Sequence, residues 1–124
     1  MLGSEFRKAI ESADHAAAVA TLSPDVILHS PVTFKPFVGK EAVAHLFSIL
    51  LEVFKDFSYS DHIEGDGIAL LIFHARVGDR DVEGIDILRF GDDGLIVDFT
   101  VMVRPMSATI ALAEAVGSRL GVTG

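Results

Sequence analysis

The stretch that decides the fold is Val82-Glu83-Gly84-Ile85-Asp86-Ile87-Leu88-Arg89-Phe90. Its composition and its alternating pattern predict a β-strand. One face of this strand carries apolar residues and a glycine, with Asp86 in the middle of them. A carboxylate on an apolar face loses its hydration, so it must accept hydrogen bonds or raise its pKa and stay protonated. We interpret Asp86 as the polar group of a pocket, with a purely structural hydrogen bond as the alternative.

The second half of the chain reads as strands joined by short turns that are rich in glycine and aspartate. The expected strands are Phe57–Ile63, Ile68–Val77, Arg80–Phe90 and Leu95–Arg104. Short turns between successive strands are typical of an antiparallel sheet.

The turn lengths predict the register of the last three strands. A two-residue turn between the first two of them pairs His74 with Glu83. A four-residue turn after Phe90 places Asp86 opposite Phe99. All three strands then agree in phase, so that one face is apolar apart from Asp86. The residues expected on that buried face are Ala69, Leu71, Phe73, Leu88, Phe90, Phe99, Val101 and Val103.

The opposite face of these three strands mixes charged residues with apolar ones. Ile72, Ile85, Ile87 and Met102 fall among arginine, glutamate, aspartate and histidine side chains. Such a face is too apolar for a surface that meets only solvent. We therefore expect a homodimer that pairs through the outer face of the sheet.

The first half of the chain reads as helices around one short strand. Ser4 and Asp14 are the expected N-caps of the first two helices, and Ser23-Pro24 ends the second. Polar residues in the third helix recur every three or four positions and form one narrow stripe, so this helix is mostly buried. The expected elements are helices from Ser4, from Asp14 to Leu22, from about Lys40 to Lys55 and from Ser107 to Leu120, with a strand over Asp25–Ser30.

Composition narrows the classes of function. The length of 124 residues predicts a single domain over residues 1–124. A net charge of −8 with scattered basic residues argues against nucleic acid as a partner. The absence of cysteine excludes disulfides, thiolate zinc sites and thiol nucleophiles. No apolar run approaches the roughly 20 residues of a membrane helix, and the start of the chain does not resemble a signal peptide, so we expect a cytoplasmic protein without a membrane partner.

Helices followed by a curled antiparallel sheet predict an α+β fold in which the helices cover the concave face of the sheet. The order of motifs resembles the NTF2-like superfamily, which includes ketosteroid isomerases, SnoaL-like polyketide cyclases and limonene epoxide hydrolases. The resemblance covers nearly the whole chain and implies a cone-shaped, cystatin-like fold with a pocket at its mouth. The motifs that carry it are Asp14–Leu22, Asp25–Pro31, Phe37–Ala42, Gly84–Phe90 and Asp93–Val97.

The resemblance also implies roles for single residues. Asp86 is similar to the oxyanion-hole aspartic acid of the ketosteroid isomerases, which stays protonated and donates a hydrogen bond to a developing enolate. The general-base aspartate of that pattern corresponds to Ser30, and its first-helix tyrosine corresponds to Phe6. The last-strand aspartate of the epoxide hydrolases corresponds to Val101. Both catalytic sets are incomplete, whereas the polar pocket groups of SnoaL-like cyclases, which deprotonate and reclose polyketide-like substrates, are compatible with this sequence.

The candidate catalytic residues are Asp86, Ser30 and His29. For Ser30 the equal alternative is a local cap after the strand. Alternation favours the outer face or an interface for His29, which becomes the alternative base if strand curvature at Pro31 turns it toward the pocket. Phe34 and Phe37, on the following loop, are candidate lid residues, with loop anchoring as the alternative. No two histidines have metal-ligand spacing on one element, so neither a metal nor a cofactor is predicted. The residues expected to contact a ligand are Phe6, Phe34, Phe37, Phe54, Phe73, Phe99 and Val101.

Three functions stay open at this point. In the first, the pocket binds a small hydrophobic carbonyl or polyketide-like molecule and isomerises or cyclises it, with protonated Asp86 donating to the ligand and Ser30 and His29 positioning it. In the second, the same pocket binds a ligand without catalysis. In the third, the chain is a homodimeric scaffold whose cavity is filled by phenylalanine side chains. An enzyme requires a second titratable group within reach of the ligand, which separates the first function from the second.

Overall fold

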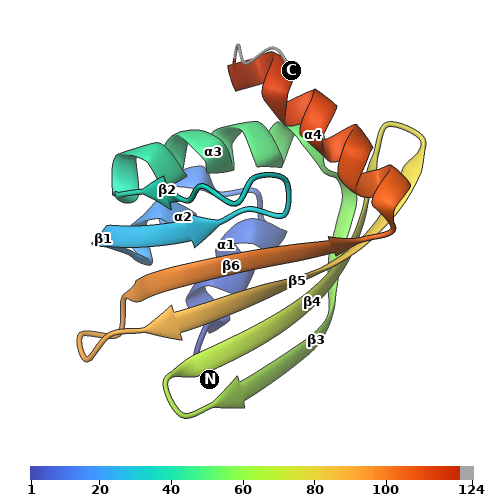
Figure 1. The fold of residues 1–124 in the computed structure, drawn as a ribbon. Coiled ribbons are helices and arrows are strands. Elements are labelled where there is room, and N and C mark those ends of the chain that lie inside the picture. Colours follow the sequence, from blue (N-terminus) through green and yellow to red (C-terminus); the bar gives the residue numbers. More distant parts are fainter. Residues whose placement is uncertain (121–124) are drawn as a thin grey trace.

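One curved sheet supports the fold in a computed structural model that describes residues 1–120 (Figure 1). Its strands follow the order β2-β1-β6-β5-β4-β3. Neighbouring strands are antiparallel, except that β1 runs parallel to β6. The strands are β1 (Leu22–His29), β2 (Phe37–Val38), β3 (Lys55–Gly65), β4 (Ile68–Val77), β5 (Arg80–Phe90) and β6 (Ile96–Arg104). The strand that carries Asp86, β5, therefore has a neighbour on each side.

Helices cover the concave side of the sheet. Figure 1 shows α1 and α2 behind the strands and α3 along their upper edge. The last helix, α4, packs against α3 and against β4, β5 and β6. None of the described helices is long and apolar enough to cross a lipid bilayer. The helices are α1 (Ser4–Glu11), α2 (His15–Ala20), α3 (Lys40–Val53) and α4 (Met106–Leu120).

The core lies between the concave face and the helices, on the face predicted to be apolar. Phe99 of β6 meets Phe6 of α1 and Phe47 of α3, with ring centroids 5.2 and 5.7 Å apart and steeply inclined ring planes. Such edge-to-face contacts add to the stabilisation that burial provides. On the predicted face, the fully buried residues are Ala69, Leu71, Phe73, Leu88 and Phe99, and the half-buried ones are Phe90, Val101 and Val103.

The register between β4 and β5 is as predicted, whereas the register between β5 and β6 is displaced by two residues. Asp86 lies opposite Val101, not Phe99. The turn pairs Phe90 with Ile96, and a β-bulge beside this pair inserts one more residue on β6. Because side chains alternate with a period of two, a shift of two residues leaves each side chain on its predicted face.

The helix ends agree only in part with the prediction. Asp14 caps α2, since its Oδ1 accepts a hydrogen bond of 3.1 Å from a backbone N–H of the first turn. Ser4 is not the N-cap of α1, because that position belongs to Gly3, whose φ of 84° favours glycine. The third helix ends at Val53, two residues early, where the backbone becomes extended and leads into β3.

The first strand begins at Leu22, three residues earlier than predicted, and contains Pro24. Proline lacks the backbone N–H that a sheet ladder requires, which is why the sequence favoured a break at this point. The pairing of β1 with β6 is interrupted between Leu22 and Ile27. The irregular stretch therefore accommodates the proline without loss of a ladder hydrogen bond.

Gly84 and Phe73 form a tight cross-strand pair beneath the aromatic core. They face each other across β5 and β4, and a Cβ atom built on Gly84 would overlap the ring of Phe73. That ring is also stacked on Phe57 at a centroid distance of 4.9 Å and meets Phe54 at 5.6 Å. Neighbouring rings on the other side therefore leave Phe73 little room to move away.

We predict that Gly84→Ala lowers the free energy of unfolding by about 1–3 kcal/mol, because the added methyl group overpacks the core. Denaturant unfolding measures this cost. In a Phe73→Leu background the same substitution costs clearly less, since the smaller side chain leaves space for the methyl group. An equal cost in both backgrounds would show that the Phe73 ring is not what excludes a side chain at Gly84.

Candidate functional site

Asp86 lies in the middle of β5 with its side chain on the concave side of the sheet. Only 6 % of the residue is exposed. Its cross-strand neighbours, Leu71 on β4 and Val101 on β6, are both apolar. The adjacent strands therefore provide no positive charge to compensate a carboxylate at this position.

Tyr59 supplies the hydrogen bond that Asp86 requires. Its hydroxyl donates to Oδ2 of Asp86 over 3.0 Å, although β4 separates the two strands. Tyr59 pairs with Phe73, and a register shift follows directly between Tyr59 and Asp61. Such irregularities redirect side chains, and this one lies beside the residue that reaches across the sheet. Tyr59 was not among the residues singled out from the sequence; the available signal was that it is the only tyrosine of the chain, on an expected strand.

Both members of this pair hold their protons more strongly than usual. Burial raises the pKa of Asp86 from 3.8 to about 7, and the hydrogen bond from Tyr59 lowers it in part. Burial also raises the pKa of Tyr59 well above 10.0, and the negative charge of ionised Asp86 raises it further. Below pH 7 the pair is therefore a tyrosine donating to a neutral carboxylic acid.

The free oxygen of Asp86 faces the cavity. Tyr59 occupies Oδ2, so the acid proton of the neutral form belongs on Oδ1. Among the described residues, no buried side-chain oxygen or nitrogen is both closed off and without a partner. Since Oδ1 has no partner within this part of the chain, it must be reachable from the cavity. Neutral Asp86 thus presents an O–H donor to whatever occupies that space.

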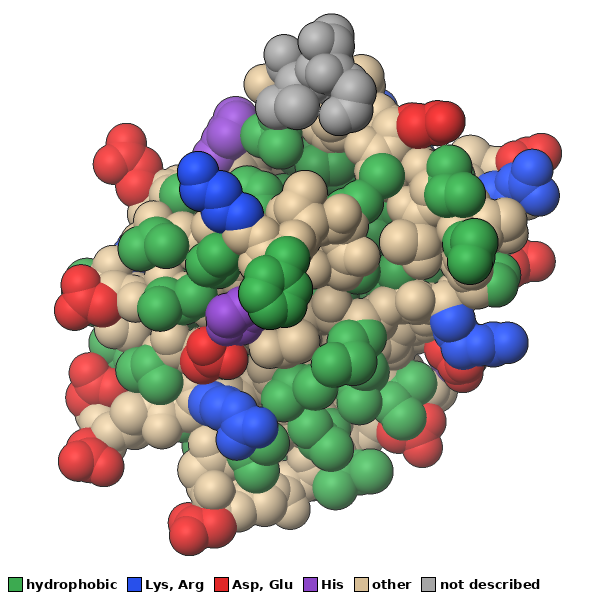
Figure 2. All heavy atoms as spheres, viewed as in Figure 1, with side chains coloured by type: hydrophobic (Ala, Val, Ile, Leu, Met, Phe, Trp, Pro, Cys, Tyr) green, Lys and Arg blue, Asp and Glu red, His purple; other side chains and the backbone are tan. Residues whose placement is uncertain are grey.

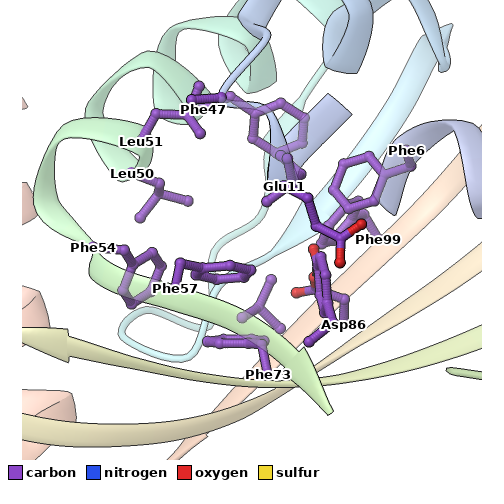
Figure 3. A pocket seen from close by; sticks show the side chains of 14 residues that line it. Phe6, Glu11, Phe47, Leu50, Leu51, Phe54, Phe57, Phe73, Asp86 and Phe99 are labelled. Carbon is purple, nitrogen blue, oxygen red and sulfur yellow. Dashed lines mark hydrogen bonds between the residues drawn. The ribbon is translucent and has the colours of Figure 1, made fainter. Parts of the chain in front are cut away.

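A cavity of about 210 Å³ opens in front of Asp86 (Figure 3). It lies between the concave face of the sheet and the helices α1 and α3. Its lining is aromatic and aliphatic, apart from three residues with polar side-chain atoms, which are Glu11, Tyr59 and Asp86. The other lining residues are Phe6, Ile10, Ala13, Phe47, Leu50, Leu51, Phe54, Phe57, Phe73, Phe99 and Val101.

Two groups of rings form the walls of this cavity. One joins Phe54, Phe57, Tyr59 and Phe73, whose centroids lie 4.9–6.4 Å apart. The other is the cluster of α1, α3 and β6 described above. Each group is closed by its own ring contacts, and the space between them stays open. The packing therefore holds the cavity open instead of filling it.

Glu11 was not among the candidate residues, yet it lines the cavity from the end of α1. Figure 3 shows its carboxylate pointing into the cavity on the side where Asp86 lies. Arg7, one turn earlier, donates from Nε to Oε2 of Glu11 over 3.2 Å, and its guanidinium lies 5.7 Å from the ring centroid of Tyr59. In the sequence, Glu11 directly follows Ile10, which belongs to the apolar stripe of this helix that begins at Phe6. This neighbouring position was the one indication that Glu11 could lie near the core.

Two of the three candidate catalytic residues lie outside the cavity. Ser30 follows β1, and its hydroxyl accepts hydrogen bonds from the backbone N–H groups of Val32 and Thr33 at 3.3 and 3.2 Å. This is a local capping role, in which the hydroxyl stabilises the loop after the strand. His29 points to the other face of the sheet, where Nε2 lies 3.0 Å from Asp98 Oδ1. The structure therefore corrects the placement of Ser30 in the pocket and the alternative role of His29 as a base, and it places His29 on the face that alternation favours.

The expected ligand-contacting residues divide in the same way. Phe6, Phe54, Phe73, Phe99 and Val101 line the cavity. The two loop phenylalanines, Phe34 and Phe37, do not line the cavity, so the prediction that they contact a ligand is corrected. Phe34 is fully exposed, and Phe37 belongs to β2 and packs against the edge of the core. A lid formed by these two rings is absent from this arrangement of the described residues.

Three further histidines make structural contacts away from Asp86. His15 and His62 each hydrogen-bond a backbone carbonyl through Nε2, at 2.7 and 2.8 Å. His74 lies 3.6 Å from Glu83 across β4 and β5, as the register predicted. Within residues 1–120, no group of three or more His, Asp or Glu side chains is arranged to hold a metal ion.

Comparison with known proteins relates this geometry to a family. The family model of the SnoaL-like domain matches residues 4–99. A steroid delta-isomerase from Pseudomonas aeruginosa has a similar structure, with 43% sequence identity, a TM-score of 0.90, and coverage of 95% of this chain and 88% of that chain. A search of curated proteins found no match.

Two further solved structures support the fold. An uncharacterized protein with a cystatin-like fold from Silicibacter pomeroyi is 28% identical, with a TM-score of 0.91 over 95% of this chain and 84% of that chain. An NTF2-like protein of unknown function from Cytophaga hutchinsonii is 18% identical, with a TM-score of 0.67 over 86% and 89%, and shows the fold alone. The predicted α+β, NTF2-like fold is confirmed, and the chain belongs to the SnoaL-like family.

Proposed function

We propose that the cavity binds a small hydrophobic carbonyl or polyketide-like compound, whose oxygen accepts a hydrogen bond from neutral Asp86. The supporting observation is a buried acid whose unpaired Oδ1 faces an otherwise apolar space. A neutral carboxyl group is a donor, and a carbonyl oxygen is an acceptor that carries no proton of its own. The two groups are therefore complementary, and an apolar ligand body matches the aromatic walls.

The size of the cavity favours a ligand of one or two rings. Its volume of about 210 Å³ is below the roughly 300–1,000 Å³ of typical ligand pockets. It exceeds the roughly 150 Å³ of an apolar cavity that binds benzene. The relative at 43% identity is named a steroid delta-isomerase, which supports a hydrophobic ligand. The smaller space favours a compound below the size of a steroid.

The lining residues also bear on whether the chain is an enzyme. Ser30 is remote, but Glu11 and Tyr59 add titratable groups to the cavity beside Asp86. This arrangement supports acid-base chemistry such as isomerisation or cyclisation more than a non-catalytic binding module. The open volume counts against a scaffold whose cavity is filled by phenylalanines.

We predict that β-tetralone, a bicyclic ketone, binds the protein below pH 7 and loses about tenfold in affinity well above it. As pH rises through the Asp86 pKa of about 7, the carboxyl group loses the proton that it donates. The resulting negative carboxylate then repels the partial negative charge of the ketone oxygen. A hydrogen bond worth about 1–1.5 kcal/mol corresponds to roughly this factor. Isothermal titration calorimetry across this pH range measures it.

Two matched controls isolate the contribution of Asp86. Tetralin, the same skeleton without the oxygen, is expected to bind with little dependence on pH. Asp86→Asn keeps a donor but does not titrate, so its affinity for β-tetralone is expected to stay constant across the range. A pH-dependent loss that persists in Asp86→Asn would assign the effect to another group. No binding of β-tetralone at any pH would refute the proposal for ketones of this size.

We also propose that two copies of the chain pair through the outer face of the sheet. Figure 2 shows hydrophobic side chains gathered over β4, β5 and β6 on the face turned to the viewer. Ile85 lies in the register between Ile72 and Met102, and the neighbouring row runs through Ile87. Met102 is 56 % exposed.

Charged rows flank these apolar rows on both sides. On one side Glu83 lies between His74 and Arg104, and on the other Arg89 pairs with Asp98. An apolar centre with a mixed-charge rim is the usual anatomy of a protein interface. Because both signs of charge are present, a second copy related by a two-fold axis supplies complementary partners.

We predict that Ile85→Glu converts a dimer into a monomer, because it places a charge at the centre of the apolar rows. Size-exclusion chromatography with light scattering distinguishes the 13.3 kDa chain from a dimer. Ile110→Glu, the same substitution at an exposed position of α4, serves as the control and is expected to remain dimeric. A monomeric wild-type protein, or an unaffected Ile85→Glu variant, would rule out this interface.

A further inference from the structure

We infer that Glu11 is the general base of the cavity, removing a proton from the carbon next to the ligand carbonyl that Asp86 holds. This inference rests on the proposed function. It goes beyond it by naming a catalytic residue on α1, a reaction class, and a substrate that must carry an acidic C–H bond beside its carbonyl group. No base is left at the position implied by the family resemblance, since Ser30 lies outside the cavity.

Glu11 is placed to reach a ligand bound at Asp86. Its side chain lines the same cavity, and Figure 3 shows the carboxylate directed inward on the Asp86 side. Its negative charge acts on the hydroxyl of Tyr59, which donates to Asp86, so the three groups share one end of the cavity. A ligand whose carbonyl oxygen meets Oδ1 of Asp86 therefore lies in the same cavity as the Glu11 carboxylate.

The ion pair with Arg7 orients the carboxylate and leaves one oxygen free. Arg7 donates to Oε2 of Glu11 over 3.2 Å, and Oε1 has no partner among residues 1–120. Arg7 itself is fixed, because its guanidinium lies over the Tyr59 ring and within 3.5 Å of His62 Nδ1. His62 is in turn held by the carbonyl oxygen of Leu2, 2.8 Å from Nε2. This positions Oε1 as the proton acceptor.

The two carboxyl groups then have opposite roles. Glu11 is half exposed and paired with Arg7, whereas Asp86 is buried among rings, which favours its neutral form. A carboxyl group must be ionised to accept a proton, whereas a carboxyl group that donates to a developing oxyanion must retain its proton. The environments of the two groups match these requirements.

The proton balance of the step is complete without a co-reactant. Oε1 of Glu11 takes the proton, and the electrons of the broken C–H bond form a C=C bond. The carbonyl π electrons move onto oxygen, and this enolate oxygen accepts the hydrogen bond from Oδ1 of Asp86, supported from behind by Tyr59. Once its carboxyl proton has been replaced from solvent, Glu11 returns a solvent hydrogen to the same carbon, which completes an exchange. In a substrate with a C=C bond beside that carbon, Glu11 instead returns the proton to the far end of this bond, which moves the double bond.

The test measures binding and exchange on the same ligand. β-Tetralone in heavy water is incubated with wild-type protein, and NMR follows the loss of the protons next to its carbonyl group. We expect exchange well above the rate in buffer. In Glu11→Gln, which keeps the shape of the side chain, exchange falls about a hundredfold or more, while the calorimetric affinity is unchanged. Glu5→Gln, an equivalent change at an exposed position of the same helix, keeps the wild-type rate.

Glu11→Asp separates a catalytic role from a structural one. It retains the carboxylate but withdraws it by one methylene group, so exchange is expected to fall by up to about a hundredfold and to stay above that of Glu11→Gln. Binding of β-tetralone with no accelerated exchange, or with equal exchange in wild type and Glu11→Gln, would overturn the role of Glu11 and leave the proposed binding intact. No binding at all would overturn both.

Discussion

A buried carboxyl group in the wall of a largely apolar cavity is the constraint on which the rest of this structure depends. Asp86 sits on a strand with a neighbour on each side, so its side chain cannot turn away, and Tyr59 provides its side-chain hydrogen bond. The folded pKa of about 7 exceeds the usual 3.8. Burial of Asp86 therefore lowers the free energy of unfolding in a pH-dependent way. This cost is absent below pH 3.8, grows as pH rises, and is complete above about pH 7, where it reaches roughly 4 kcal/mol. A group that costs a large share of the roughly 5–15 kcal/mol by which a domain is stable is not explained by stability. The ligand recognition that we propose would explain it.

The surrounding packing is arranged to leave space in front of that group. The aromatic side chains between the sheet and the helices contact one another in two clusters, and the space between the clusters stays open. Gly84 contributes by its lack of a side chain, since the Phe73 ring lies directly over it. On the helical side, α1 brings Glu11 to the rim with its own counterion, Arg7. A buried neutral acid and a half-exposed acid paired with an arginine thus share one cavity.

The alternation of side chains along the strands correctly predicted which face of the sheet each strand residue occupies. Features that arise from local irregularities, such as bulges and loop hydrogen bonds, could not be predicted in this way. The period of two placed Asp86, Phe73 and Phe99 on the concave face, and this survived a two-residue error of register because an even shift preserves the face. Ser30 was placed in the pocket by family resemblance, but the local hydrogen bonds of the loop hold it. Alternation favoured the outer face for His29, where it pairs with Asp98, and strand curvature does not turn it toward the cavity.

The two polar residues that share the cavity with Asp86 could not be derived from one strand. Tyr59 comes from beyond β4 and lies beside a register shift, and Glu11 comes from a helix whose position over the sheet no local pattern predicts.

Carbon NMR of the Asp86 carboxyl group during a pH titration tests the central claim most directly. We expect a midpoint near 7, moving upward in Tyr59→Phe because the lost hydrogen bond favours the charged form. A midpoint near 3.8 would show a carboxylate that stays charged in the fold, which contradicts a neutral donor in the cavity.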